Sequence, residues 1–94
     1  PIIVSGSHDG VIIYWNSSNG QMSSIQATSV SQHKNQVQGI RYDLANNQLV
    51  SCGLDDTLKF IDANEFKYIK EIRLDSQPQG LDVNLNGIVA VACI

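Results

Sequence analysis

A short run of residues occurs twice in this chain, with the same order of residue types each time. Residues 5–16 read SGSHDGVIIYWN and residues 51–62 read SCGLDDTLKFID. A second echo pairs residues 36–40, QVQGI, with residues 77–81, QPQGL. Self-similarity at a spacing of roughly 40–45 residues is typical of architectures that repeat one small structural unit. The chain is therefore predicted to consist of consecutive copies of such a unit.

Each unit is predicted to be built from short β-strands. Runs rich in β-branched and aromatic residues, bounded by turn residues, cover residues 2–6, 11–15, 22–25, 37–42, 48–52, 57–62, 68–74, 79–84 and 88–93. The Asn86-Gly87 dipeptide predicts a tight hairpin turn, and residues 16–20 predict another turn. In residues 68–74, Ile69, Glu71 and Arg73 alternate with the other side chains, which predicts a strand with one more solvent-exposed face. No segment predicts a helix.

Short strands that repeat at this spacing indicate an all-β fold made of β-propeller blades. With the strands of a blade labelled a to d from the central channel outward, the chain reads b-c-d, a-b-c-d, a-b. We expect a partial blade in residues 1–35, one complete four-stranded blade in residues 36–74 and a partial blade in residues 75–94. Because blades bury their faces against neighbours, we expect the chain to be a fragment of one larger propeller that needs its remaining blades.

Composition narrows the possible functions. The 94 residues have a net charge of −3, and the six Lys and Arg residues form no basic cluster, which argues against nucleic-acid binding. No apolar run approaches the roughly 18 residues of a membrane span. The apolar fraction of 43% suits an ordered globular segment. We therefore expect a protein that acts away from nucleic acids and membranes.

The two cysteines, Cys52 and Cys93, have the same spacing as Gln36 and Gln77. We therefore expect them at equivalent positions of neighbouring units, on separate sheets, where a disulfide is disfavoured. Their spacing also lacks the pattern of a metal site. Two buried, reduced thiols in a cytoplasmic protein are the expectation.

The two echoes share a serine and an aspartate, Ser5 and Asp9 in the first and Ser51 and Asp55 in the second; His33 and Trp15 complete the set of candidate site residues. As a serine hydrolase, the chain would need Ser51 exposed on a strained elbow beside an oxyanion hole, but no Gly-x-Ser-x-Gly motif surrounds it. A buried imidazole needs partners for both nitrogens, and Ser51 and Asp55 could provide them for His33. We therefore expect a structural network and no catalytic residue.

Two further features have competing interpretations. Asp55-Asp56 could indicate a metal site, but calcium and magnesium sites use several oxygens at defined loop spacing, so turn stabilisation is favoured. We expect no metal and no cofactor. Residues 65–70 mix charges with aromatics, as interfaces do; we favour packing of Phe66 or Tyr68 on a neighbouring blade. Trp15 is likewise expected to pack within the blades.

These repeats resemble WD repeats. A blade of that family carries a His in the loop before strand a, a Ser or Thr in strand b, an Asp in the b–c turn, and Trp-Asp at the end of strand c. The middle unit matches with His33, Ser51 and Asp55 but closes on Ile61-Asp62. The first unit matches with Ser5, Asp9 and Trp15-Asn16. The third departs most, with Gln77-Pro78 where the His-containing loop is expected.

A wider set of motifs is similar to the WD-repeat proteins that act on actin together with cofilin. The most specific of these motifs are the Asp55-Asp56-Thr57 turn and the AVACI segment of residues 90–94. The resemblance implies two linked seven-bladed propellers, of which this segment belongs to the second, and a cytoplasmic, cytoskeletal protein that promotes disassembly of cofilin-decorated actin filaments. It assigns no residue to partner contact. The alternative is a WD-repeat scaffold of another complex, such as a ubiquitin ligase or a chromatin assembly factor.

Overall fold

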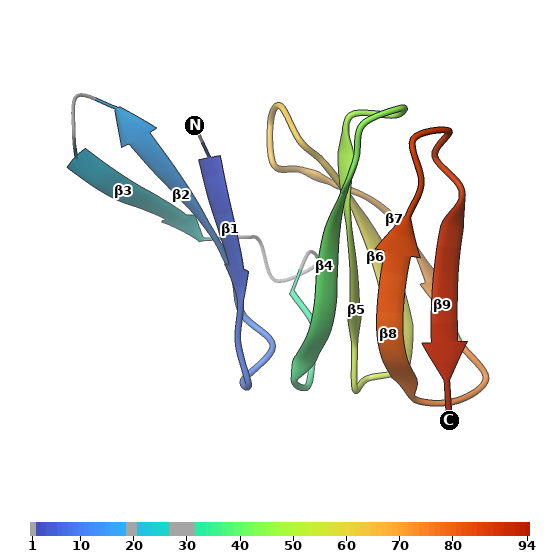
Figure 1. The fold of residues 1–94 in the computed structure, drawn as a ribbon. Helices are drawn as coiled ribbons and strands as arrows, with labels where there is room; N and C mark the ends of the chain where they lie inside the picture. The colour runs from blue at the N-terminus through green and yellow to red at the C-terminus, as the bar shows by residue number, and fades with distance from the viewer. Residues whose placement is uncertain (1, 19–20, 27–31) are drawn as a thin grey trace.

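The computed structural model describes residues 2–18, 21–26 and 32–94. All secondary-structure elements in these ranges are β-strands (Figure 1). In chain order they are β1 (Ile2–Gly6), β2 (Ile12–Ser18), β3 (Gln21–Gln26), β4 (Val37–Asp43), β5 (Gln48–Gly53), β6 (Thr57–Asp62), β7 (Tyr68–Arg73), β8 (Pro78–Val83) and β9 (Val89–Cys93). A search of the described residues finds no helix long and apolar enough to cross a membrane.

The strands form three antiparallel sheets, visible in Figure 1 as successive groups along the chain. The first sheet has the order β1-β2-β3, the middle sheet β4-β5-β6-β7 and the third sheet β8-β9. Each paired strand lies beside its neighbour in sequence, so the sheets are built from hairpins. The prediction of an all-β fold with one four-stranded blade and parts of two neighbours is confirmed.

The sequence echoes are also echoes in backbone geometry. Ser5 lies opposite Ile13 in the first sheet, and Ser51 lies opposite Lys59 in the middle sheet. The inner strands β4 and β8 each shift register near their start, where Gln38 and Gln79 have no opposite residue. Such a β-bulge inserts one residue and strengthens the local twist, so neighbouring units enter their sheets in the same way.

The two central strands of the middle sheet, β5 and β6, are buried on both faces. One face packs against the first sheet through a cluster of Ile12, Tyr14, Leu49 and Ile61. The other face packs against the third sheet through a cluster of Val50, Cys52, Leu58, Phe60 and Leu81. Burial of apolar surface is the main driving force for folding, so each sheet depends on its neighbours for its core.

Three hairpin turns share one geometry. In each turn the last residue of the loop has a positive φ: 88° at Gly10, 61° at Asp56 and 82° at Gly87. Each of these residues donates its backbone N–H to the carbonyl three positions earlier, over 3.1 Å. The left-handed region favours glycine and tolerates aspartate. The last hairpin is therefore not the two-residue turn that Asn86-Gly87 predicts; Gly87 ends a three-residue loop instead.

Two strand predictions need correction. β2 continues to Ser18, so residues 16–18 are strand rather than turn, while residues 19–20 lie outside the described ranges. Residues 69–73 of β7 are exposed on both faces, with Ile69 48% and Ile72 46% exposed. The alternation in this segment does not produce one wet face, because β7 is the edge strand of the middle sheet.

The expectation that both cysteines are buried is wrong. Both are free, but Cys52 is buried and Cys93 is exposed. Gly39 lies opposite Cys52, whereas the equivalent Gly80 lies opposite Ala92. Ala92 therefore occupies the place of Cys52, but Ala92 and Cys93 are both exposed, because β9 is the outer strand of the two-stranded third sheet.

Candidate functional site

His33 is buried in the loop before β4, with partners at both ring nitrogens. Its Nε2 lies 2.8 Å from the Ser51 hydroxyl, and its Nδ1 lies 2.9 Å from the Asp55 carboxylate and 3.0 Å from the Thr57 hydroxyl. Because a carboxylate only accepts, the neutral ring donates from Nδ1 to Asp55 and accepts at Nε2 from Ser51. The structure thus places three of the predicted residues together and adds Thr57, which the sequence analysis missed.

The β5–β6 turn holds the Asp55 carboxylate in place. The Thr57 hydroxyl donates to its Oδ1 over 2.8 Å, and the backbone N–H of Lys34 donates to its Oδ2 over 2.9 Å. The turn is thereby connected to the loop that carries His33. Asp55 joins two segments that are far apart in the sequence.

The network holds an uncharged ring beside a charged carboxylate at neutral pH. Burial lowers the pKa of the His33 imidazole, against the opposing effect of Asp55. Burial acts to raise the pKa of the Asp55 carboxyl, but the hydrogen bonds from Lys34, His33 and Thr57 together outweigh it and lower the pKa. The fold therefore favours neutral His33 and ionised Asp55.

A pH dependence of stability follows from the lowered pKa of His33. Below the unfolded-state pKa of about 6.5, the unfolded chain binds a proton at this residue more readily than the folded chain does. The free energy of unfolding is therefore expected to fall as the pH drops through about 6.5, and to level off below the folded-state pKa. Urea unfolding of the full-length protein from pH 8 to pH 5 measures this step. The step should persist in His8→Asn, which changes an exposed histidine, and disappear in His33→Ala; its persistence in His33→Ala would contradict the assignment.

The hydrogen bonds link Ser51, His33 and Asp55 in the order of a catalytic triad, but a substrate cannot reach the Ser51 hydroxyl. Ser51 is 0% exposed and lies inside β5 rather than on an elbow after a strand. A nucleophilic serine must reach a substrate carbonyl next to oxyanion donors. Buried in this way, the three groups satisfy one another's hydrogen bonds and cannot attack a substrate.

In the first sheet the predicted residues form separate contacts. The Trp15 indole donates to the Ser5 hydroxyl over 2.9 Å. Asp9 accepts from the Ser7 hydroxyl and from the Val11 backbone N–H, and the bond from Ser7 is the main cause of its lowered pKa. Asp9 therefore stabilises the β1–β2 turn, as aspartates in turns do, and the printed contacts of the described residues do not connect it to Ser5 or Trp15.

A second buried carboxylate was missed by the sequence analysis. Asp43, at the end of β4, is fully buried and accepts from the Asn46 side chain over 2.8 Å and from the Gln48 side chain over 2.9 Å. The bond from the Asn46 side chain is the largest cause of the lowered pKa of Asp43, ahead of burial, which opposes it. An Asp that opens a turn rich in Asn is the signal that could have identified it.

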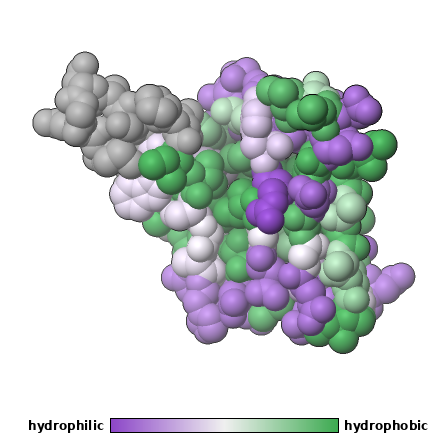
Figure 2. All heavy atoms as spheres, viewed as in Figure 1, coloured by the Kyte–Doolittle hydropathy of each residue, from purple (hydrophilic) through white to green (hydrophobic). Residues whose placement is uncertain are grey.

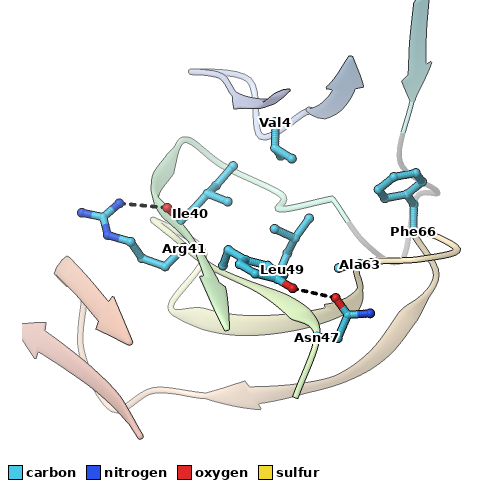
Figure 3. Close-up of a pocket in the computed structure, with 8 residues that line it drawn as sticks. Val4, Ile40, Arg41, Asn47, Leu49, Ala63 and Phe66 are labelled. Atoms are coloured by element: carbon cyan, nitrogen blue, oxygen red, sulfur yellow. Dashed lines mark hydrogen bonds between the residues drawn. The ribbon is translucent and has the colours of Figure 1, made fainter. Parts of the chain in front are cut away.

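An apolar hollow of about 440 Å³ lies between the first and middle sheets (Figure 3). Val4 of β1, Ile40 of β4 and Leu49 of β5 contribute to its walls, together with Phe66. The Phe66 ring stacks on buried Tyr14, with ring centroids 4.3 Å apart. The expectation that Phe66 packs on a neighbouring blade is therefore confirmed.

Comparisons with known proteins agree with this architecture. Residues 24–62 match the WD40 family, described as "WD domain, G-beta repeat". The chain is 37% identical over 94 residues to Actin-interacting protein 1 of Drosophila melanogaster and 32% identical over 94 residues to WD repeat-containing protein 1 of Xenopus tropicalis, in each case over 98% of the chain. It is 38% identical over 92 residues, or 95% of the chain, to a 66 kDa stress protein of Physarum polycephalum.

The chain spans 14–15% of the length of these relatives. Within that span, the similarity extends across all three sheets rather than over one motif. The middle sheet has the four antiparallel strands of a blade, with His33, Ser51 and Asp55 at the positions of the repeat pattern. The chain belongs to the WD40-repeat family.

Proposed function

We propose that this chain is part of a non-catalytic interaction platform that binds cofilin-decorated actin filaments and promotes their disassembly in the cytoplasm. The observation that carries the proposal is the 37% identity to Actin-interacting protein 1 over 98% of the chain. Burial of Ser51 supports a role without covalent chemistry. The mechanism is differential affinity: a platform that binds one filament state better than another shifts the population towards that state.

The platform requires further blades of the same polypeptide. The strand β1 has one open edge in the described sheet, and the apolar hollow between Val4 and Ile40 lies beside it. In the middle sheet the equivalent place is taken by β4, which pairs with β5. We propose that residues 1–35, 36–74 and 75–94 belong to three consecutive blades, and that an inner strand of the first blade fills this hollow.

Co-sedimentation of the full-length protein with actin filaments, with and without cofilin, tests the proposed function. More protein is expected in the pellet when the filaments carry cofilin, and actin is expected to move from the pellet to the supernatant as the protein is added. Filaments without cofilin are the matched control. Equal results in both samples would contradict the actin proposal and favour a scaffold of another complex.

A further inference from the structure

A second hollow, of about 250 Å³, opens beside the His33 network. The described residues that line it are all polar: Gln32, Lys34, Asp55, Thr57, Lys59, Glu71 and Arg73. Figure 2 shows that hydrophilic side chains gather at the lower end of the molecule, the end that holds the β1–β2 and β5–β6 turns in Figure 1. The hollow therefore differs in chemistry from the apolar hollow between the sheets.

The floor of this hollow is formed by β6 and β7. Thr57 lies opposite Arg73, and Lys59 lies opposite Glu71, so all four side chains share one face of the sheet. The Lys59 side chain is only 7% exposed, and its ammonium lies 3.3 Å from the Glu71 carboxylate. A buried cation with a fixed partner gives the floor a defined charge arrangement.

Both carboxylates in the hollow already have donors. The two Asp55 oxygens accept from His33, Thr57 and the Lys34 backbone. One Glu71 oxygen lies 3.3 Å from both the Lys59 ammonium and the Tyr68 hydroxyl. The acidic groups are therefore engaged within the structure.

Two cations at the hollow remain open to a ligand. Within the described part of the chain, the Lys34 ammonium and the Arg73 guanidinium have no hydrogen-bond or ion-pair partner. Both residues are exposed, while Lys34 is anchored through its backbone. The lining holds three cations and two carboxylates, although the whole chain has a net charge of −3.

We propose that this hollow, the anion hollow, binds a carboxylate side chain from an acidic segment of a partner protein, with Lys34 and Arg73 as the pairing residues. An arginine guanidinium pairs with a carboxylate through two parallel N–H donors. The partly enclosed floor lowers the local dielectric and strengthens this pairing relative to open water. The proposal concerns binding of an acidic segment and does not require that the partner be actin.

The test uses the full-length protein and a fluorescein-labelled hexaglutamate peptide, with binding followed by fluorescence anisotropy at low salt. The double variant Lys34→Gln/Arg73→Gln is expected to raise the dissociation constant about tenfold, because it removes both charge pairs with the peptide. The control is Lys67→Gln, an exposed lysine next to Glu65 at the other end of the sheet, which should leave the dissociation constant unchanged. Absence of peptide binding, or equal binding by wild type and the double variant, would overturn the proposal.

Competition separates the carboxylate from a phosphate ligand. Free glutamate is expected to displace the labelled peptide at a lower concentration than inorganic phosphate does. The opposite order would overturn the carboxylate assignment and indicate a phosphoryl group. Because no filament enters either assay, failure here would leave the proposed actin function standing, and failure in co-sedimentation would leave the anion hollow standing.

Discussion

Gly10→Ala is expected to lower the free energy of unfolding of the full-length protein by about 2–4 kcal/mol. Gly10 has a φ of 88°, a conformation that costs an L-residue with a side chain roughly 1–2 kcal/mol. An alanine Cβ at this position would lie 2.7 Å from the Asn35 carbonyl oxygen and still closer to the His33 carbonyl oxygen. Both obstacles are backbone atoms, so the turn itself would have to move.

Movement of this turn would affect the junction between two sheets. The Gly10 carbonyl accepts the His33 backbone N–H over 3.0 Å, and the Ser7 carbonyl accepts the Val37 backbone N–H over 3.0 Å. These bonds connect the β1–β2 turn to the segment that leads into β4. A displaced turn would strain or break them next to the buried His33 ring, and the loss of a buried hydrogen bond adds about 1 kcal/mol to the cost.

Urea unfolding of the full-length wild type and variants measures the effect, and Gly80→Ala is the matched control. Gly80 has no positive φ, and a Cβ there would meet only the Ala92 Cβ, at 4.0 Å. This control is expected to change stability by at most about 0.5 kcal/mol. Equal unfolding midpoints for the two variants would show that the conformation of the β1–β2 turn at Gly10 does not contribute to stability.

Local patterns predicted the strands well because β-branched and aromatic runs bounded by turn residues carry that information within a few positions. The strand from residue 57 to residue 62 is observed with the predicted ends, and β5 differs by one residue. The pairing of Ser51 with His33 was predicted from the resemblance to WD repeats, together with the need of a buried imidazole for partners at both nitrogens. Elements and their order were therefore accessible from the sequence.

Contacts between sheets could not be predicted from local sequence patterns. The bond from the His33 N–H to the Gly10 carbonyl joins two turns whose proximity depends on how the sheets pack. The strand position of Cys93 depends on turn length: the opposite pair Tyr42 and Leu49 encloses one residue more than the pair Val83 and Val89. A difference of one residue reverses the face of every later side chain in the strand, and similarity of spacing alone does not detect it.

His33→Ala is expected to lower the free energy of unfolding of the full-length protein by about 1–3 kcal/mol, the cost of leaving buried polar groups without a partner. The variant removes the acceptor of the Ser51 hydroxyl, which is 0% exposed, and one donor to the Asp55 carboxylate. It also opens a cavity between the β5–β6 turn and the loop before β4. Both effects act in the same direction.

The matched control for His33→Ala is His8→Ala, which truncates an exposed histidine in the β1–β2 turn. Its unfolding midpoint in urea should stay close to that of the wild type, because surface substitutions outside such networks usually change stability by less than about 0.5 kcal/mol. A second variant, Ser51→Ala, separates the hydrogen bond from the cavity: it removes the partner of Nε2 but leaves the ring in place. If the network stabilises the blade, the unfolding midpoint of Ser51→Ala should lie between those of His8→Ala and His33→Ala. An unchanged midpoint in His33→Ala would mean that the buried set of His33, Ser51 and Asp55 contributes nothing to the stability of the blade.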